Sequence, residues 1–187
     1  MEEQSIISID TNSQRIRLNL GSGGKKMEGA INVDSNELLE PDLVADIRDI
    51  ASHFGPESVD EIFLFHTLEH LSQKDGANLL QDCFNILNKG GVIVIECPDI
   101  MKCAINLLQA KVGGDPYRVE RFGLFGIYGF DDLGMDREEM QHRWGYWPEY
   151  LGGIMDKIGF SAIQDGPAES KSFAAVERDF RIEGLKF

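Results

Sequence analysis

Short runs in which apolar and polar residues alternate are separated by longer stretches with a helical period. Alternation is typical of β-strands, and apolar residues three and four positions apart are typical of helices. The predicted strands are residues 15–20, 30–34, 43–46, 59–65, 91–97, 160–164 and a segment within 173–186. The predicted helices are residues 73–87, 100–110 and 148–158. This interleaving predicts an α/β fold with one Rossmann-like, doubly wound and mostly parallel sheet.

The spacing of the predicted strands indicates how the chain crosses between the first two strands and how the last two strands pair. Only about nine residues separate the glycine-rich turn after 15–20 from the second strand, whereas a parallel crossover normally takes a dozen or more. The first crossover helix should therefore be short or missing. The two closing strands should form an antiparallel C-terminal edge, and the last register stays open because 173–176 and 180–185 both alternate.

The length of 187 residues suits one domain. Residues 1–14 are polar and mixed, which predicts a flexible N-terminal arm, and residues 15–187 then form the single domain. Residues 111–147 are a long irregular stretch, and all four tyrosines and both tryptophans fall within 117–150. Such a stretch is expected to be a substrate lid or an interface insertion, and a homodimer is one form of that interface.

Charge narrows the choice of partners. The net charge of −14 repels phosphate backbones, so nucleic acid is not an expected partner.

No apolar run is long enough for a membrane span, and the N-terminus lacks the features of a signal peptide, so the expected location is cytoplasmic. The three cysteines form no CxxC pair, which argues against a disulfide framework, and no residue spacing suggests a metal site.

The glycine-rich turn at residues 18–24 reads Leu-Asn-Leu-Gly-Ser-Gly-Gly and follows the first predicted strand. In α/β sheets, ligands bind beyond the carboxyl ends of the strands. Two ligands fit such a turn, a methyl donor or a dinucleotide, and Lys26 stands where a dinucleotide turn has its third glycine. Asp34 and Asp46 end the next two strands, where one carboxylate could accept ribose hydroxyls and the other could meet adenine.

Further motifs follow in a specific order: GAINVD, VDEI, HTLEHL, LNKGG and PD. With the turn, they make residues 16–100 resemble the class I S-adenosylmethionine-dependent methyltransferases. The group that the chain is most similar to is a small bacterial type, associated with cell-surface saccharide biosynthesis. Asn19 departs from this pattern, because many relatives have an acid there.

The resemblance implies S-adenosylmethionine as the cofactor. Residues 19–23 would line its methionine part, Asp34 would hold the ribose, Asp46 and Ile47 would flank the adenine, and Phe65 would lie near the sulfonium. The residues that the resemblance assigns to the cofactor are Asn19, Leu20, Gly21, Ser22, Gly23, Asp34, Asp46, Ile47, Phe65 and His66.

The resemblance further implies methyl transfer to a small-molecule or saccharide-type acceptor, with oxygen as the expected target. A hydroxyl acceptor needs a base, and His66 directly follows the fourth strand. Glu69 and His70 are weaker candidates, and His142 is expected over the cleft from the opposite side. Two alternatives remain open: an inactive donor-binding or scaffold subunit, and a dinucleotide enzyme.

Overall fold

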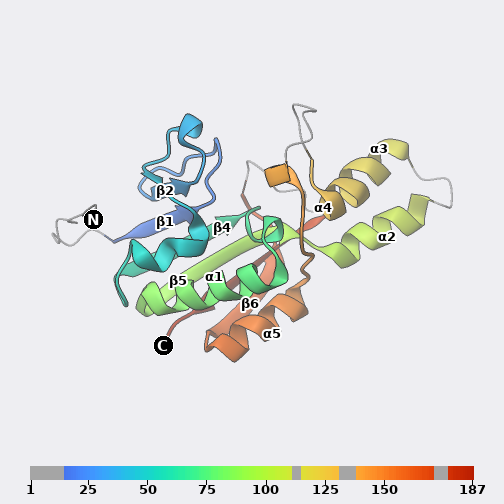
Figure 1. Cartoon of the computed structure of the whole chain (residues 1–187). Coiled ribbons are helices and arrows are strands. Elements are labelled where there is room, and N and C mark those ends of the chain that lie inside the picture. Colours follow the sequence, from blue (N-terminus) through green and yellow to red (C-terminus); the bar gives the residue numbers. More distant parts are fainter. Residues whose placement is uncertain (1–14, 111–114, 131–137, 171–176) are drawn as a thin grey trace.

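A computed structural model describes residues 15–110, 115–130, 138–170 and 177–187. The chain forms one seven-stranded sheet in the order β3-β2-β1-β4-β5-β7-β6 (Figure 1). The strands are β1 (Arg17–Leu20), β2 (Ile31–Asp34), β3 (Leu43–Val44), β4 (Val59–Phe65), β5 (Leu87–Pro98), β6 (Ser161–Pro167) and β7 (Asp179–Leu185). The predicted N-terminal arm lies outside the described residues.

Strands β1 to β5 are mutually parallel, and β7 pairs antiparallel with both β5 and β6. The prediction of a mostly parallel sheet with an antiparallel C-terminal edge is therefore confirmed. The last strand is Asp179–Leu185, in line with the run 180–185, whereas the competing run 173–176 lies outside the described residues. β5 begins earlier than predicted, because Leu87 already pairs with Val59 before the two glycines at 90 and 91.

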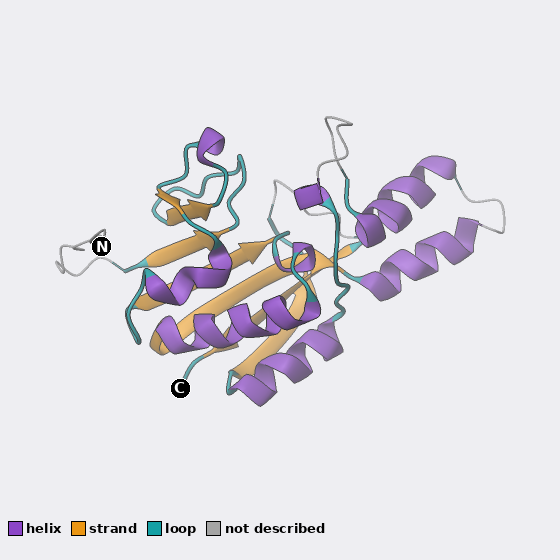
Figure 2. Cartoon of the chain, in the orientation of Figure 1, coloured by secondary structure: helices purple, strands orange, loops and turns teal. Residues whose placement is uncertain are grey.

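Helices α1, α5 and the 3₁₀ helix η2 lie on one face of the sheet, while α2, α3 and α4 lie beyond the carboxyl end of β5 (Figures 1 and 2). The α-helices are α1 (Gln73–Ile86), α2 (Ile100–Ala110), α3 (Pro116–Val119), α4 (Phe125–Tyr128) and α5 (Pro148–Ile158). The shorter helical elements are η1 (Glu37–Leu39), η2 (Ile47–Ser52), η3 (Leu68–His70), η4 (Glu120–Leu124) and η5 (Glu138–Met140). None of the helices in the described ranges has the length and apolar character needed to span a bilayer.

Helix boundaries follow from local chemistry. The Ser72 side chain accepts a hydrogen bond from the Asp75 N–H at 3.1 Å and so caps the start of α1. α5 starts with a proline and ends at Gly159, whose φ of +119° suits glycine. The three long helices therefore begin and end within one residue of their predicted bounds.

A loop replaces the first crossover helix, as the short spacing predicts: residues 21–30, all described, contain no helix. Asn32 organises this loop from within β2. Its Oδ1 accepts hydrogen bonds from Asn19 Nδ2 at 2.9 Å and from the Met27 N–H at 2.7 Å. Its own N–H and Nδ2 donate to Asp42. One buried amide thus fixes the loop to β1 and β2 without a helix.

The sheet has two unlike faces. The face under α1, η2 and α5 holds the buried core, with Leu18, Ile62 and Ile93 from three neighbouring strands. On the opposite face, Arg17 pairs with Glu61 at 2.7 Å, and its guanidinium lies 5.1 Å from the centre of the Phe63 ring. In the part of the chain that the structure describes, the apolar core therefore lies on one side of the sheet.

Residues 116–128 run as one continuous helical stretch, with the π-turn η4 between α3 and α4. The sequence pattern predicts an irregular stretch over 111–147, and this is wrong for residues 116–128. A Cβ at Gly123 would lie 2.6 Å from Leu107, and one at Gly126 would collide with Cys103. Both glycines instead allow this stretch to pack tightly on α2. Residues 111–114 and 131–137 of the predicted lid lie outside the described residues.

Candidate functional site

A cleft of about 340 Å³ opens at the carboxyl ends of β1 and β4. Asn19, Gly21 and Ser22 line it from the glycine turn, Phe65 from the end of β4, and Ser170 from the segment after β6. Glu96 in β5 holds that last segment, because its carboxylate accepts hydrogen bonds from the N–H groups of Glu169 and Ser170. The structure therefore brings four of the predicted cofactor residues together in one cleft.

Gly21 allows the chain to pass close to the segment after β4. Its φ is +67°, and a Cβ there would lie 2.7 Å from Thr67 Oγ1. Thr67 in turn donates from Oγ1 to the Leu20 carbonyl at 3.0 Å. The sequence alone suggests that a ligand requires this glycine. The structure shows that the contact with Thr67 requires it as well.

The N–H groups of the turn are bonded within the protein. Gly21 and Ser22 both donate to the Val33 carbonyl, at 2.9 and 3.0 Å, and Gly23 donates to Asp34 Oδ2 at 2.8 Å. Asp34 Oδ1 also accepts from the Asn36 N–H. A carboxylate oxygen can accept more than one hydrogen bond, so Asp34 keeps acceptor capacity for a hydroxyl.

The other predicted cofactor residues lie in different settings. Leu20 is fully buried in the core, and Ile47 packs against the core. Asp46 caps η2 and forms an ion pair with Arg48, whose side-chain hydrogen bond lowers the pKa of Asp46 against the opposing effect of burial. An adenine contact at Asp46 would have to share the carboxylate with Arg48.

His66 directly follows β4 and has a φ of +51°, which is uncommon for a residue other than glycine. Its Nδ1 lies 3.2 Å from Glu69 Oε1, and its Nε2 lies 3.5 Å from Asp179 Oδ2. Asp179 also accepts a hydrogen bond from Arg178 at 3.0 Å. The predicted base is therefore held between two buried carboxylates at the carboxyl ends of the central strands.

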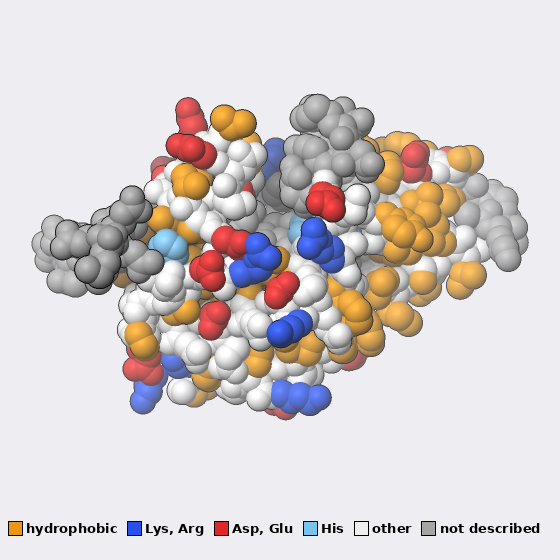
Figure 3. Space-filling model, viewed as in Figure 1, with side chains coloured by type: hydrophobic (Ala, Val, Ile, Leu, Met, Phe, Trp, Pro, Cys, Tyr) orange, Lys and Arg blue, Asp and Glu red, His pale blue; other side chains and the backbone are white. Residues whose placement is uncertain are grey.

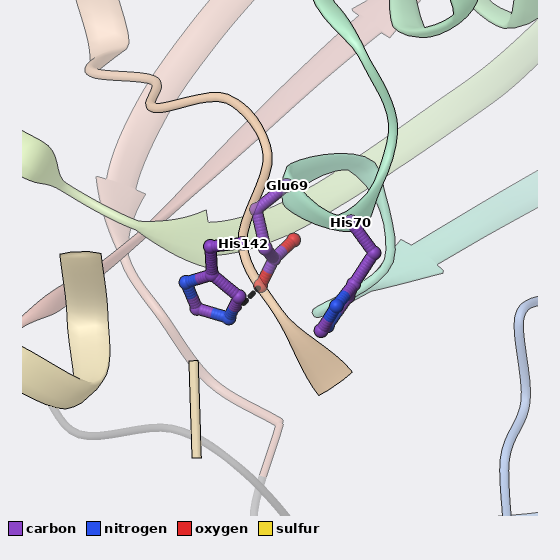
Figure 4. A group of neighbouring side chains, drawn as sticks. All are labelled: Glu69, His70 and His142. Atoms are coloured by element: carbon purple, nitrogen blue, oxygen red, sulfur yellow. Dashed lines mark ion pairs between the residues drawn. The ribbon is translucent and has the colours of Figure 1, made fainter. Parts of the chain in front are cut away.

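His70 and His142 lie on either side of Glu69 (Figure 4). His142 Nε2 lies 3.9 Å from Glu69 Oε1, and the rings of His142 and His70 meet edge to face at 4.9 Å. The chain around His142 is anchored beside η3, since the N–H groups of Arg143 and Trp144 donate to the Glu69 carbonyl. We call Glu69, His70 and His142 the Glu–His cluster.

The charges of this group shift its pKa values. Burial raises the pKa of Glu69, but the hydrogen bond from His66 and the nearby histidines outweigh it and lower this pKa to about 2. Burial lowers the pKa of His66, but Glu69 and Asp179 outweigh burial and the net shift is upward. For His142, burial dominates and lowers the pKa. Glu69 is thus an anion, and His142 favours its neutral form.

A second cleft, of about 370 Å³, lies on the other side of His142. The aromatic side chains of Trp144 and Trp147 line it, with Ile100 and Ile127. The predicted lid therefore contributes the walls of this cleft in its described part. The sequence does not predict the Glu–His cluster, although the closely spaced His66, Glu69 and His70 of the HTLEHL motif are a usable signal.

Comparisons with known proteins fit this geometry. Residues 18–95 match the family model described as a methyltransferase domain. A search of curated protein sequences finds no match to the chain. Among solved structures, an S-adenosylmethionine-dependent methyltransferase from Archaeoglobus fulgidus is 18% identical, with a TM-score of 0.61 over 93% of this chain and 87% of that chain.

Two further structures have the same fold. An S-adenosylmethionine-dependent methyltransferase from Methanosarcina mazei is 15% identical, with a TM-score of 0.63 over 93% of both chains. Haemonchus contortus phosphoethanolamine N-methyltransferase 2, solved with S-adenosyl-L-methionine, is 12% identical, with a TM-score of 0.56. The superposition covers 92% of this chain and 48% of the Haemonchus contortus protein.

The match of residues 18–95 to a methyltransferase-domain model supports an enzyme, and the solved structures share the Rossmann-like fold of this chain. The names of these solved structures give S-adenosylmethionine as the cofactor or ligand of those proteins. The residues fit this cofactor, since the cleft at the glycine turn has backbone and Phe65 walls and Asp34 keeps acceptor capacity beside it. The comparisons therefore favour the methyl donor over the dinucleotide alternative.

Proposed function

We propose that the chain methylates a hydroxyl oxygen of a small-molecule or saccharide-type acceptor. One observation carries this proposal: a series of contacts joins the two clefts. Phe65 lines the first cleft, the next residue His66 bonds Glu69, and Glu69 contacts His142, which lines the second cleft. A donor in the first cleft and an acceptor in the second would thus approach each other at His66.

The first cleft would take the donor. Asn19, Gly21, Ser22 and Phe65 border it directly, and Asp34 would accept the ribose hydroxyls. Gly23 and Leu20 would act through the backbone, and Asp46 with Ile47 would flank the adenine. When bound, S-adenosylmethionine supplies a methyl group that its sulfonium already activates.

His66 would take the proton of the acceptor hydroxyl. With Nδ1 donating to Glu69 Oε1, Nε2 would take the proton, and Asp179 Oδ2, 3.5 Å from Nε2, would stabilise the imidazolium that forms. A carboxylate that orients an imidazole in this way is a general feature of histidine bases. Such a base contributes roughly 10²- to 10⁴-fold to a rate, in addition to the effect of alignment.

The second cleft would take the acceptor. Trp144 and Trp147 provide flat apolar surfaces, and His142 adds a polar group at its edge. Aromatic surfaces beside polar groups suit sugars and small ring systems. His142 would thus act on acceptor binding. The alternative of an inactive donor-binding or scaffold subunit gains no support from this arrangement of two linked clefts.

Release of S-adenosylhomocysteine tests the proposal, with nucleotide sugars, free saccharides, lipids and small acids as candidate acceptors. With the acceptor that supports turnover, His66→Ala should lower kcat by about 10²- to 10⁴-fold. Donor affinity, measured by calorimetry, should stay unchanged. His53→Ala is the matched control, because His53 is exposed and lies outside the site. Donor binding without turnover on any acceptor would instead favour the scaffold alternative.

Two further expectations stay predictions. A cytoplasmic location is one of them. The other is a homodimer, for which the exposed apolar side chains of α2 offer a surface (Figure 3).

A further inference from the structure

We propose that the Glu–His cluster binds one divalent transition-metal ion, of the class to which Zn²⁺ belongs. Glu69, His70 and His142 each offer one ligand atom, and these atoms lie within 4.8 Å of one another. Figure 4 shows the Glu69 carboxylate between the two imidazole rings. Two of the ligands come from η3, and the third comes from the distant segment that packs beside it.

Backbone carbonyls fix the tautomers of both histidines. His142 Nδ1 lies 3.0 Å from the Gly126 carbonyl, and His70 Nδ1 lies 3.2 Å from the Gln141 carbonyl. A carbonyl oxygen can only accept, so each Nδ1 carries the proton and each Nε2 keeps a lone pair. Histidines that bind metals are oriented in this way by their second nitrogen.

Glu69 supplies a second and independent observation. Its side chain is 3% exposed, and Oε1 already bonds His66. Oε2 is buried and has no hydrogen-bond partner among the described residues. A buried carboxylate oxygen without a partner is costly, and coordination of a cation would satisfy it. Because Oε1 also lies 3.9 Å from His142 Nε2, the carboxylate as a whole faces the cluster, and an ion held there would supply the partner that Oε2 lacks.

The ligand types define the class of ion. Two imidazole nitrogens and one carboxylate suit Zn²⁺ and its neighbours, whereas Mg²⁺ and Ca²⁺ prefer oxygen ligands. Metal–ligand bonds of about 2.0–2.2 Å require ligand atoms about 3.4 Å apart in a tetrahedron. The cluster would therefore contract by about 1 Å, and three protein ligands leave a fourth position open, as in catalytic zinc sites.

This proposal departs from the expectation, drawn from sequence spacing, that the chain holds no metal. The spacing is uninformative because His142 comes from a different part of the chain. The proposal does not depend on the methyl acceptor, since metal binding can be measured without donor or acceptor.

The test is titration of chelator-treated full-length protein with Zn²⁺ by calorimetry, and with Co²⁺ by visible absorption. The wild type should bind one ion per chain and give the intense absorption of low-coordinate Co²⁺. His142→Ala, His70→Ala and Glu69→Gln should each weaken Zn²⁺ binding by at least about 100-fold, since even groups behind the ligands contribute 10- to 100-fold. His53→Ala removes a histidine outside the cluster and should bind as the wild type does.

Absence of stoichiometric binding by the wild type would overturn the proposal. Equal affinity in the wild type and all three cluster variants would do the same, because the ion would then lie elsewhere. Donor affinity and Tm, measured on each variant without metal, identify any variant that fails to fold. His70→Ala removes the most exposed of the three side chains, so it keeps the test decisive if a more buried variant is unstable.

Discussion

The proposed donor side and the proposed acceptor side of the site are built in different ways. The donor side depends mainly on backbone conformation within residues 19–34, with Gly21 at a positive φ beside Thr67. The acceptor side consists of side chains from η3, the segment around His142 and the start of β7. The two sides lie at the same edge of the sheet. A short sequence motif specifies the first cleft, whereas only tertiary packing brings the residues of the second side together.

Gly21→Val should give the largest effect, because it breaks the backbone basis of the donor side. The valine would need a left-handed conformation and would collide with Thr67, which should destabilise the protein by about 2–5 kcal/mol and abolish donor binding. Calorimetry with S-adenosylmethionine and a thermal melt measure both effects. Gly55→Val is the matched control, because Gly55 lies outside the site, has no left-handed φ, and a Cβ there meets nothing within 4 Å. Donor binding retained by Gly21→Val would contradict the comparison.

Asp34→Ala should weaken donor binding by about 1.5–3 kcal/mol, the value of a hydrogen bond to a charged group. Asp46→Ala should have a smaller effect, because Arg48 already occupies that carboxylate. Calorimetric affinities for the two variants test this order. If Asp46→Ala has the larger effect, the assignment of the ribose to Asp34 is wrong.

Glu96 sharpens the comparison, because it is a distant side chain on which the donor cleft depends. Burial raises the pKa of Glu96, but hydrogen bonds from Ser170, Glu169 and Arg181 outweigh it and lower the pKa. The stabilisation is therefore complete above the unfolded value, near pH 4.3, and is lost as pH falls through the folded value. Glu96→Gln should lower the free energy of unfolding by about 1.5–3 kcal/mol at pH 7.

The difference between wild type and Glu96→Gln should begin to shrink as pH falls below about 4.3, where the unfolded chain takes up a proton, and should vanish once pH is below the lowered pKa of the folded protein. Denaturant unfolding at several pH values measures it. A difference that stays constant down to pH 3 would show that shape, and not charge, is what Glu96 contributes.

Ile105→Ser should have the smallest effect on stability. Ile105 is 52% exposed on α2, and surface substitutions usually change stability by less than about 0.5 kcal/mol. Met101 and Leu108 are exposed on the same helix. If this face joins two copies, light scattering should give a dimer mass for the wild type and a monomer mass for the variant. If light scattering gives a monomer mass for the wild type, the prediction of a homodimer is wrong.

The sequence predicts the sheet, the long helices and the glycine turn that lines the first cleft, because these depend on local patterns. Alternation locates β1 to β5, and the spacing of Gly21 and Asp34 locates the cleft. The Glu–His cluster could not be predicted, because it depends on the path of residues 138–147 back to η3. The helical stretch 116–128 is also missed, since Gly123 and Gly126 resemble turn residues until α2 is beside them.

The tight contact between Gly126 and Cys103 also makes this thiol a built-in reporter of local opening. Cys103 is fully buried, and burial raises its pKa to about 12, so the folded protein should resist alkylating reagents at this position. Modification would require α2 to separate from residues 116–128. The rate at which Cys103 reacts therefore measures how often these helices part, while Cys83 and Cys97 in the core report only global unfolding.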